Sequence, residues 1–163
     1  MQMQQGPVGT TKAVLPNWNQ ELEADIHCAA ASDCGVLIIG PSAEAEAVTT
    51  QIHRLGRRSH EPLTVIDCGD PDCLRMLANE RTGGTLWLRD VDLLSPLLQS
   101  KLLARIPDRH WRVIASSRVC PMSSLEPRLF YLLNMVSIVL GSPARGGGSE
   151  PGMHLKAGSA RPS

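Results

Sequence analysis

Apolar runs and helical patterns alternate along this chain. The first run is VLII at 36–39, and such an unbroken stretch is typical of a strand buried on both faces. Four further runs have the same character and predict strands at 63–66 (LTVI), 85–88 (TLWL), 112–116 (RVIAS) and 136–140 (VSIVL).

Segments with helical spacing separate these strands. Before the first strand, the spacing of apolar residues predicts a helix that Asn17 caps. After it, a second helix is predicted with Val48, Ile52 and Leu55 on one side and its end near Gly56.

Three later helices complete the alternation. They are predicted at 73–78, from Ser95 and Pro96 through Leu103, and at 126–134. Ser95 followed by Pro96 is a typical cap and first-turn pair. Because strand and helix alternate about five times, we expect one three-layer α/β domain with a five-stranded parallel sheet and helices on both faces.

The composition changes at both ends of the 163-residue chain. Residues 1–15 lack periodicity and predict a flexible arm, and residues 16–140 are long enough for one domain with a core. Residues 141–163 are rich in Gly, Ser and Pro and predict a disordered tail.

Charge and composition narrow the classes of function. A formal net charge of zero and 3% aromatic residues argue against a nucleic-acid surface, and no direct DNA-binding motif is visible. No apolar run approaches the ~18 residues of a membrane span. The N-terminal sequence has no apolar segment typical of a secretory signal, so we expect a cytoplasmic, bacterial-type protein.

The five cysteines do not form a disulfide or metal-binding pattern. Their number is odd, and DCGDPDC at 67–73 has neither a C-x-x-C pair nor a nearby histidine. We therefore expect reduced structural cysteines and no metal site.

The turn after the first strand raises the central question about function. A phosphate-binding loop reads G-x-x-x-x-G-K-[ST] at such a point. Here VLIIGPSAEAEAV places Ala45 at the second glycine and Glu46 at the lysine. The turn is either a phosphate loop that lost its residues or a strand–turn–helix that never had them.

Four strings follow one another along the chain in the order of a known family pattern. QIHRLGRRSHEPLTVIDC (51–68) resembles A-I-H-x-x-S-x-R-x-x-x-P-F-V-x-V-N-C, and GGTLWLRDVDLLSPLLQSKLLARI (83–106) resembles G-G-T-L-F-L-D-E-I-x-x-x-x-x-x-x-Q-x-K-L-L-R-V-L. RVIASSR (112–118) resembles R-V-I-A-A-T-N, and LFYLLNMVSIVL (129–140) resembles L-Y-Y-R-L-N-V-V-x-I-x-L. Together the strings resemble the central AAA+ ATPase domain of sigma-54-dependent transcription activators. The resemblance implies the P-loop strand order of AAA+ proteins, with ATP and Mg²⁺ as the family's ligands.

The chain departs from the family at its phosphate loop, G-E-S-G-T-G-K-E. Only Gly40 and Ser42 match; Ala43 and Ala45 replace two glycines, and Glu46 replaces the lysine. A carboxylate in place of an ammonium changes attraction for phosphate into repulsion.

The other chemical positions of the family are also changed. The Asp-Glu pair that holds Mg²⁺ and polarises water becomes Arg89 and Asp90, and Arg118 replaces the sensor asparagine. The arginine fingers of F-R-x-D-L-Y-Y-R-L become Glu126 and Leu132. The resemblance therefore implies remnants of a nucleotide site with no catalytic residue, no metal ligand and no retained cofactor.

Two pieces of the activators are not found in the sequence. The insertion that carries the sigma-54-gripping G-A-F-T-G-A loop is replaced by about sixteen residues between Cys68 and Thr85. The activators continue past the fifth strand into a helical lid, whereas this sequence continues into its Gly-, Ser- and Pro-rich tail, so we expect the lid subdomain to be absent.

The main functional hypothesis is a degenerate, non-hydrolysing AAA+ domain of the sigma-54 activator type. It would act in transcription regulation or signalling by contacting a protein partner. The alternatives are a nucleotide-responsive regulator that still binds ATP weakly and a remnant without retained function. The partner and the oligomeric state stay open.

Three smaller features carry separate expectations. Glu44 or Glu46 lies at the start of a helix and could act as a built-in anion in the vacated phosphate site; the alternative is that both point into solvent. His53 matches a family position at which a packing or capping role is more natural than catalysis. The arginines within 54–58 are expected to be solvated.

Overall fold

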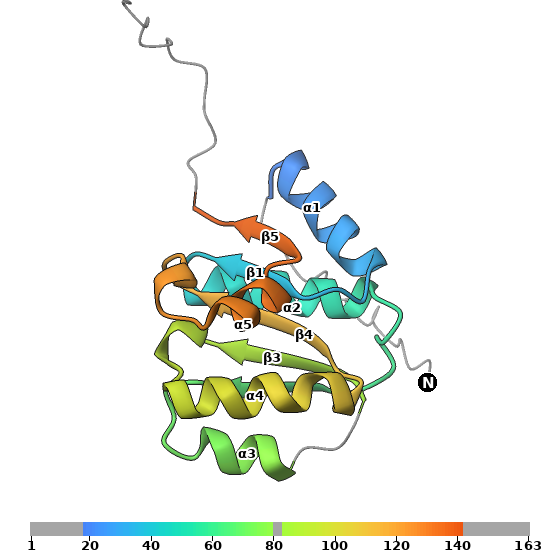
Figure 1. The fold of residues 1–163 in the computed structure, drawn as a ribbon. Coiled ribbons are helices and arrows are strands. Elements are labelled where there is room, and N and C mark those ends of the chain that lie inside the picture. Colours follow the sequence, from blue (N-terminus) through green and yellow to red (C-terminus); the bar gives the residue numbers. More distant parts are fainter. Residues whose placement is uncertain (1–17, 80–82, 142–163) are drawn as a thin grey trace, which may run out of the picture.

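The computed structural model describes residues 18–79 and 83–141 (Figure 1). The predicted arm at 1–15, and the predicted tail after Gly141, lie outside the described residues. Five parallel strands form one sheet in the order β2-β3-β4-β1-β5. The strands are β1 (Val36–Ile39), β2 (Leu63–Asp67), β3 (Thr85–Arg89), β4 (Arg112–Ser117) and β5 (Val136–Val139).

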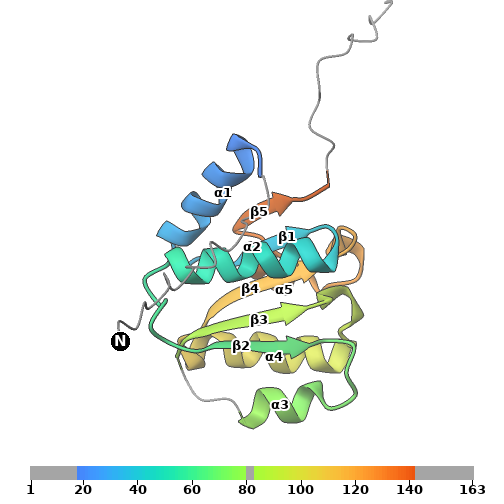
Figure 2. The same cartoon turned by 180° about the vertical axis from the view of Figure 1, so that it is seen from behind.

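Helices cover both faces of this sheet, as the alternating pattern predicted. One face carries α1 (Gln20–Ala31) and α2 (Ser42–Leu55), and Figure 2 shows α2 lying across it. The other face carries α3 (Cys73–Asn79), α4 (Pro96–Arg109) and α5 (Pro127–Leu133). Two short 3₁₀ turns, η1 (Val91–Leu93) and η2 (Pro121–Ser123), lie at the ends of strands.

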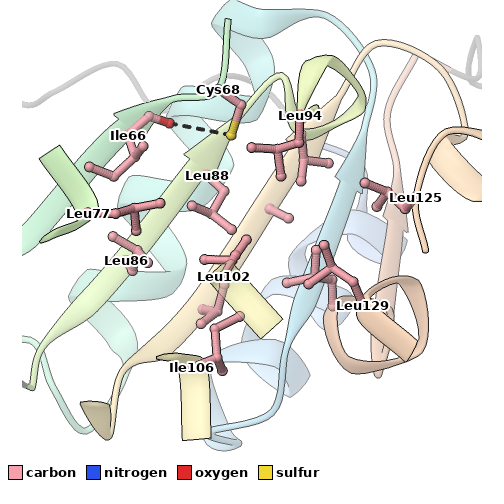
Figure 3. Packing of buried hydrophobic residues seen from close by; sticks show 14 of the residues in the cluster. Ile66, Cys68, Leu77, Leu86, Leu88, Leu94, Leu102, Ile106, Leu125 and Leu129 are labelled. Carbon is pink, nitrogen blue, oxygen red and sulfur yellow. Dashed lines mark hydrogen bonds between the residues drawn. The ribbon is translucent and has the colours of Figure 1, made fainter. Parts of the chain in front are cut away.

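The apolar runs are unbroken because the central strands are buried on both faces. In β1, Leu37 belongs to the cluster shared with α3, α4 and α5 (Figure 3), whereas Val36 and Ile38 belong to the cluster shared with α1 and α2. In β3, Leu86 faces the first cluster and Trp87 the second. The alternation of side chains along a strand thus fills two cores at once.

The helix predictions agree with the structure except at three points. Helix α4 continues to Arg109, six residues beyond the predicted Leu103. Ser95 caps α4 by accepting a hydrogen bond from the Leu98 N–H. The cap of α1 is Asn19, whose side chain accepts from the Leu22 N–H at 2.9 Å; the prediction of Asn17 was wrong because the extended residue before the first turn lies two positions later. Leu55 was also placed wrongly: it is 44% exposed, and the buried side of the last turn of α2 ends at His53.

Candidate functional site

The residues singled out from the sequence gather at the carboxyl ends of the strands. This is the edge at which parallel α/β sheets bind ligands. Gly40 and Ser42 follow β1, Glu46 lies one turn into α2, Arg89 and Asp90 stand at the end of β3, and Arg118 follows β4.

The turn between β1 and α2 is very short. Strand β1 ends at Ile39 and α2 begins at Ser42, so only Gly40 and Pro41 connect them. The Ala45 N–H donates to the Pro41 carbonyl at 2.9 Å, the bond of a regular helix turn. Residues 43–46, which align with G-T-G-K of the family's phosphate loop, therefore lie in the first turns of α2.

Gly40 is held between two neighbouring strands. Its N–H donates to the Ser117 carbonyl of β4 at 2.9 Å, and its φ is +152°. On the other side, a Cβ at this position would lie 2.5 Å from the Leu140 Cβ, just past β5. Only glycine fits here, because both the backbone angle and the approach of Leu140 disfavour a side chain.

The N-terminus of α2 has no side-chain cap. Pro41 occupies the cap position, and the N–H groups of Ser42, Ala43 and Glu44 precede the first bond of the helix ladder. Glu44 and Glu46 are exposed, and neither forms a hydrogen bond or ion pair with the residues that the structure describes. The structure thus matches the solvent-facing alternative rather than the built-in anion.

Arg89 forms an ion pair that the sequence reasoning did not anticipate. Its guanidinium donates to the Asp67 carboxylate at 2.9 Å and lies 5.9 Å from the centre of the Trp87 ring. The hydrogen bond from Arg89 lowers the pKa of Asp67, and the Gly69 N–H bonded to the same carboxylate acts in the same direction. Asp67 carried a signal in the sequence, since the family pattern V-N-C has asparagine there.

The remaining polar residues at this edge lie apart from that pair. Asp90 adopts a left-handed backbone, with φ 53° and ψ 53°, and its carbonyl accepts the Leu93 N–H. The nearby Asp92, which was not singled out, accepts a hydrogen bond from the Ser117 hydroxyl at 2.8 Å. Arg118 is exposed and forms no bond with the described residues, so the structure does not bring it into contact with Arg89 or Asp90.

Gln99, which matches the glutamine of the family pattern, and Glu126, which replaces an arginine of that pattern, both have structural roles. The Gln99 side chain donates to the carbonyls of Leu94 and Ser124, both at 2.9 Å, and accepts the Glu126 N–H at 2.6 Å. Glu126 in turn caps α5 by accepting the Leu129 N–H. Gln99 therefore ties the start of α4 to the segment before α5.

His53 has the packing role expected of it. Its Nδ1 lies 2.9 Å from the Thr85 hydroxyl oxygen in a buried contact between α2 and β3, and burial lowers its pKa. The arginines within 54–58 are not uniformly solvated. Arg58 pairs with Asp33 at 3.4 Å and lies 3.7 Å from Glu61, so it belongs to a local ion network.

Among residues 18–79 and 83–141, no group of three or more His, Cys, Asp or Glu side chains could hold a metal ion. Cys68 and Cys73 are buried in the core, consistent with structural roles. No helix in this part of the chain is both long and apolar enough to cross a membrane.

Comparisons with known proteins agree on the fold. The chain aligns with NtrX from Brucella abortus in complex with ATP at a TM-score of 0.64, with 22% identity over 73% of this chain and 36% of that one. The P-loop NTPase domain of a sigma-54 transport activator from E. coli gives 0.61, with 20% identity over 72% and 98%. The RuvB Holliday junction branch migration motor from Thermotoga maritima gives 0.55, with 14% identity over 75% and 45%.

These likenesses confirm the P-loop/AAA+ fold that the resemblance implied. The chain spans about a third of the NtrX chain that it matches. A search of curated proteins gives no match. The family described as the Sigma-54 interaction domain matches residues 16–140, which is most of the chain and contains every described strand. The chain therefore belongs to the Sigma-54 interaction domain family.

Proposed function

We propose that this domain is a catalytically degenerate member of its family, which acts in transcription regulation or signalling through protein contacts and does not hydrolyse ATP. The observation that carries the proposal is the start of α2 at Ser42, directly after Gly40 and Pro41.

A phosphate loop works because its backbone N–H groups curve around the phosphates while a lysine neutralises their charge. In this chain, the Ala45 N–H is already donated to the Pro41 carbonyl. Wrapping a triphosphate would require the first turn of α2 to unwind. It would also bring phosphate toward the carboxylates of Glu44 and Glu46, which carry the wrong charge.

The second support comes from the position of the family's metal ligand. Arg89 stands there as a permanent cation, and its partner Asp67 is a carboxylate already occupied by the ion pair. A Mg²⁺ ion approaching Arg89 would meet like charge. Without a metal at this position, the phosphate charge would not be neutralised and the attacking water would not be polarised in the family's way.

Exposed apolar side chains at the same edge support a role in protein contacts. Four of them are 58–67% exposed and come from adjoining turns: Leu93, Leu97, Val119 and Met122. The turns that carry them are joined by the Gln99 hydrogen bonds and by the Ser117–Asp92 bond. Clustered exposed apolar residues mark protein interaction surfaces more often than scattered ones do.

The test is phosphate release from ATP by the purified protein in the presence of Mg²⁺. We expect no release above a heat-inactivated control. A matched protein with Arg89→Ala shows whether the preparation carries a contaminating ATPase, because contamination gives the same rate in both samples. Release by the wild type that the Arg89→Ala change alters would contradict the proposal.

One observation favours the second candidate, a regulator that binds ATP weakly. The amides of Ser42, Ala43 and Glu44 lack partners in the helix ladder, and helix N-termini attract anions. ATP would then raise the melting temperature without being hydrolysed. A concentration-dependent rise with ATP, absent with adenosine, would favour this candidate over the first.

A further inference from the structure

The amino ends of the strands, opposite the site described above, border a second concave region. A pocket of about 690 Å³ lies between the segment before β1, the start of β4, and helices α4 and α5. Its lining is mainly apolar and includes Ile106, Trp111, Tyr131, Leu132 and Met135.

The size and lining of this pocket are those of a small-molecule site. Ligand pockets of proteins commonly measure ~300–1,000 Å³ and combine apolar walls with a few polar groups that orient the ligand. Tyr131 is 76% exposed and Met135 55% exposed, although both line the pocket. Apolar surface that remains open to water in a concavity is stabilised when an apolar ligand covers it.

The charged side chains at the pocket indicate the sign of the ligand's charge. Among the lining residues that the structure describes, the one cation is Arg128, which is exposed and forms no ion pair with the described residues. The acid of the lining, Asp33, is paired with Arg58 at 3.4 Å. The unpaired charge is therefore positive, and it complements an anion.

The sequence supports the same assignment independently. Against the family pattern F-R-x-D-L-Y-Y-R-L, Leu132 stands at the second arginine and Arg128 at the aspartate. The first change replaces a cation with an apolar side chain inside the lining, and the second replaces an anion with a cation. Together they produce an apolar pocket whose described lining carries one unpaired positive charge, that of Arg128.

We propose that this pocket binds a small amphipathic anion, a carboxylate carrying an aliphatic or aromatic body. The body contacts Trp111, Tyr131 and Leu132, and the carboxylate pairs with the Arg128 guanidinium, which can donate two parallel hydrogen bonds to it. This site is separate from the strand ends where the family's nucleotide chemistry resides, and it does not depend on whether ATP binds there.

Calorimetric titration with decanoate, and with decyltrimethylammonium as the matched cation, tests the proposal on the full chain. We expect saturable one-to-one binding of decanoate and at least about tenfold weaker binding of the cation. Arg128→Gln should weaken decanoate binding about tenfold through loss of the charge-assisted pair. Tyr131→Ala should weaken both ligands, because it removes apolar contact.

Val139→Ala is the control, because Val139 is 62% exposed at the carboxyl end of β5 and does not line the pocket. Arg128 and Tyr131 are themselves exposed, so their variants should keep the wild-type melting temperature. Absence of decanoate binding to the wild type would overturn the proposal. Equal affinity for the two ligands, or decanoate binding that neither pocket variant weakens, would overturn it as well, since the charge or the location would then be wrong.

Discussion

Asp67 and Arg89 are direct partners in the register of β2 and β3, and their side chains form a 2.9 Å ion pair at the carboxyl ends of these strands. The cation at the family's metal position is thus held by a carboxylate on the adjacent strand. Both side chains remain more than a third exposed, so the pair contributes little stability and mainly fixes the charge arrangement of the site.

The ion pair predicts a small stability difference that depends on pH. The pKa of Asp67 is lowered below its ordinary value of 3.8, so its stabilising effect is present above that value and is lost as the pH falls through the lower, folded-state pKa. Asp67→Asn should cost about 0.5 kcal/mol at neutral pH. In urea titrations, this difference from wild type should shrink below about pH 4.

Asp25→Asn is the matched control, because Asp25 is exposed and has no partner among the described residues. A cost for Asp67→Asn that equals the control at neutral pH would show that the ion pair contributes nothing.

Gly40 predicts a larger effect on stability. Gly40→Ala introduces a Cβ that would lie 2.5 Å from the Leu140 Cβ, at a backbone angle that favours glycine. We expect a loss of about 2 kcal/mol or more in the free energy of unfolding. Gly69→Ala, in the turn after β2, meets the flexible end of the Leu93 side chain and the Asp67 carboxylate, and it should cost clearly less. Equal losses would mean that the approach of Leu140 does not restrict the turn.

His53 predicts a loss of stability in mildly acidic solution. Burial lowers its pKa from the ordinary value of 6.5, so the unfolded chain takes up a proton before the folded one as the pH falls. Stability is therefore full above about pH 6.5 and declines as the pH falls toward the folded-state pKa. The melting temperature of His53→Gln should decline less over this range, whereas that of His27→Gln, an exposed histidine, should follow the wild type.

The segment between β2 and β3 predicts the behaviour toward sigma-54. This segment holds the seven-residue helix α3 in place of the long insertion that carries the family's gripping loop. We expect no co-elution with purified sigma-54 on gel filtration at ~0.15 M salt, at which exposed charge contacts are screened. A stable complex under these conditions would show that another surface makes the contact.

The strands were predictable because their apolar runs serve two cores. Each predicted strand matches the structure within one residue at its ends, and Ser95 caps α4 as expected. The choice between Asn17 and Asn19 as a cap was not predictable, since both are good capping residues and flank the same tryptophan.

The sequence predicted where the residues of the candidate site lie, but it did not predict which of them contact one another. The residues near Gly40, Arg89 and Arg118 reach the same edge because parallel strands end there. The Asp67–Arg89 pair requires the register of two strands that are distant in sequence, which no local pattern reveals. The early start of α2 had a local cause, because alanine and glutamate favour a helix over a glycine-like loop.

The charge and the shape of the β1–α2 turn can be separated by one double substitution. Glu44→Gln with Glu46→Lys removes the carboxylates and restores the lysine but leaves Ala43 and Ala45 in the helix. We expect this variant to bind ATP no better than the wild type. ATP-dependent stabilisation of the variant alone would show that charge, rather than the helix start at Ser42, excludes the nucleotide.

Calorimetric titration of the wild-type protein with Mg²⁺-ATP tests the central claim most directly. Because α2 begins at Ser42 and Arg89 is paired with Asp67, we expect no saturable heat at ATP concentrations up to several millimolar. This range would reveal binding as weak as a Kd of ~1 mM, which corresponds to a binding free energy of about −4 kcal/mol. A saturable one-to-one isotherm that requires Mg²⁺ and is lost with adenosine would contradict the claim.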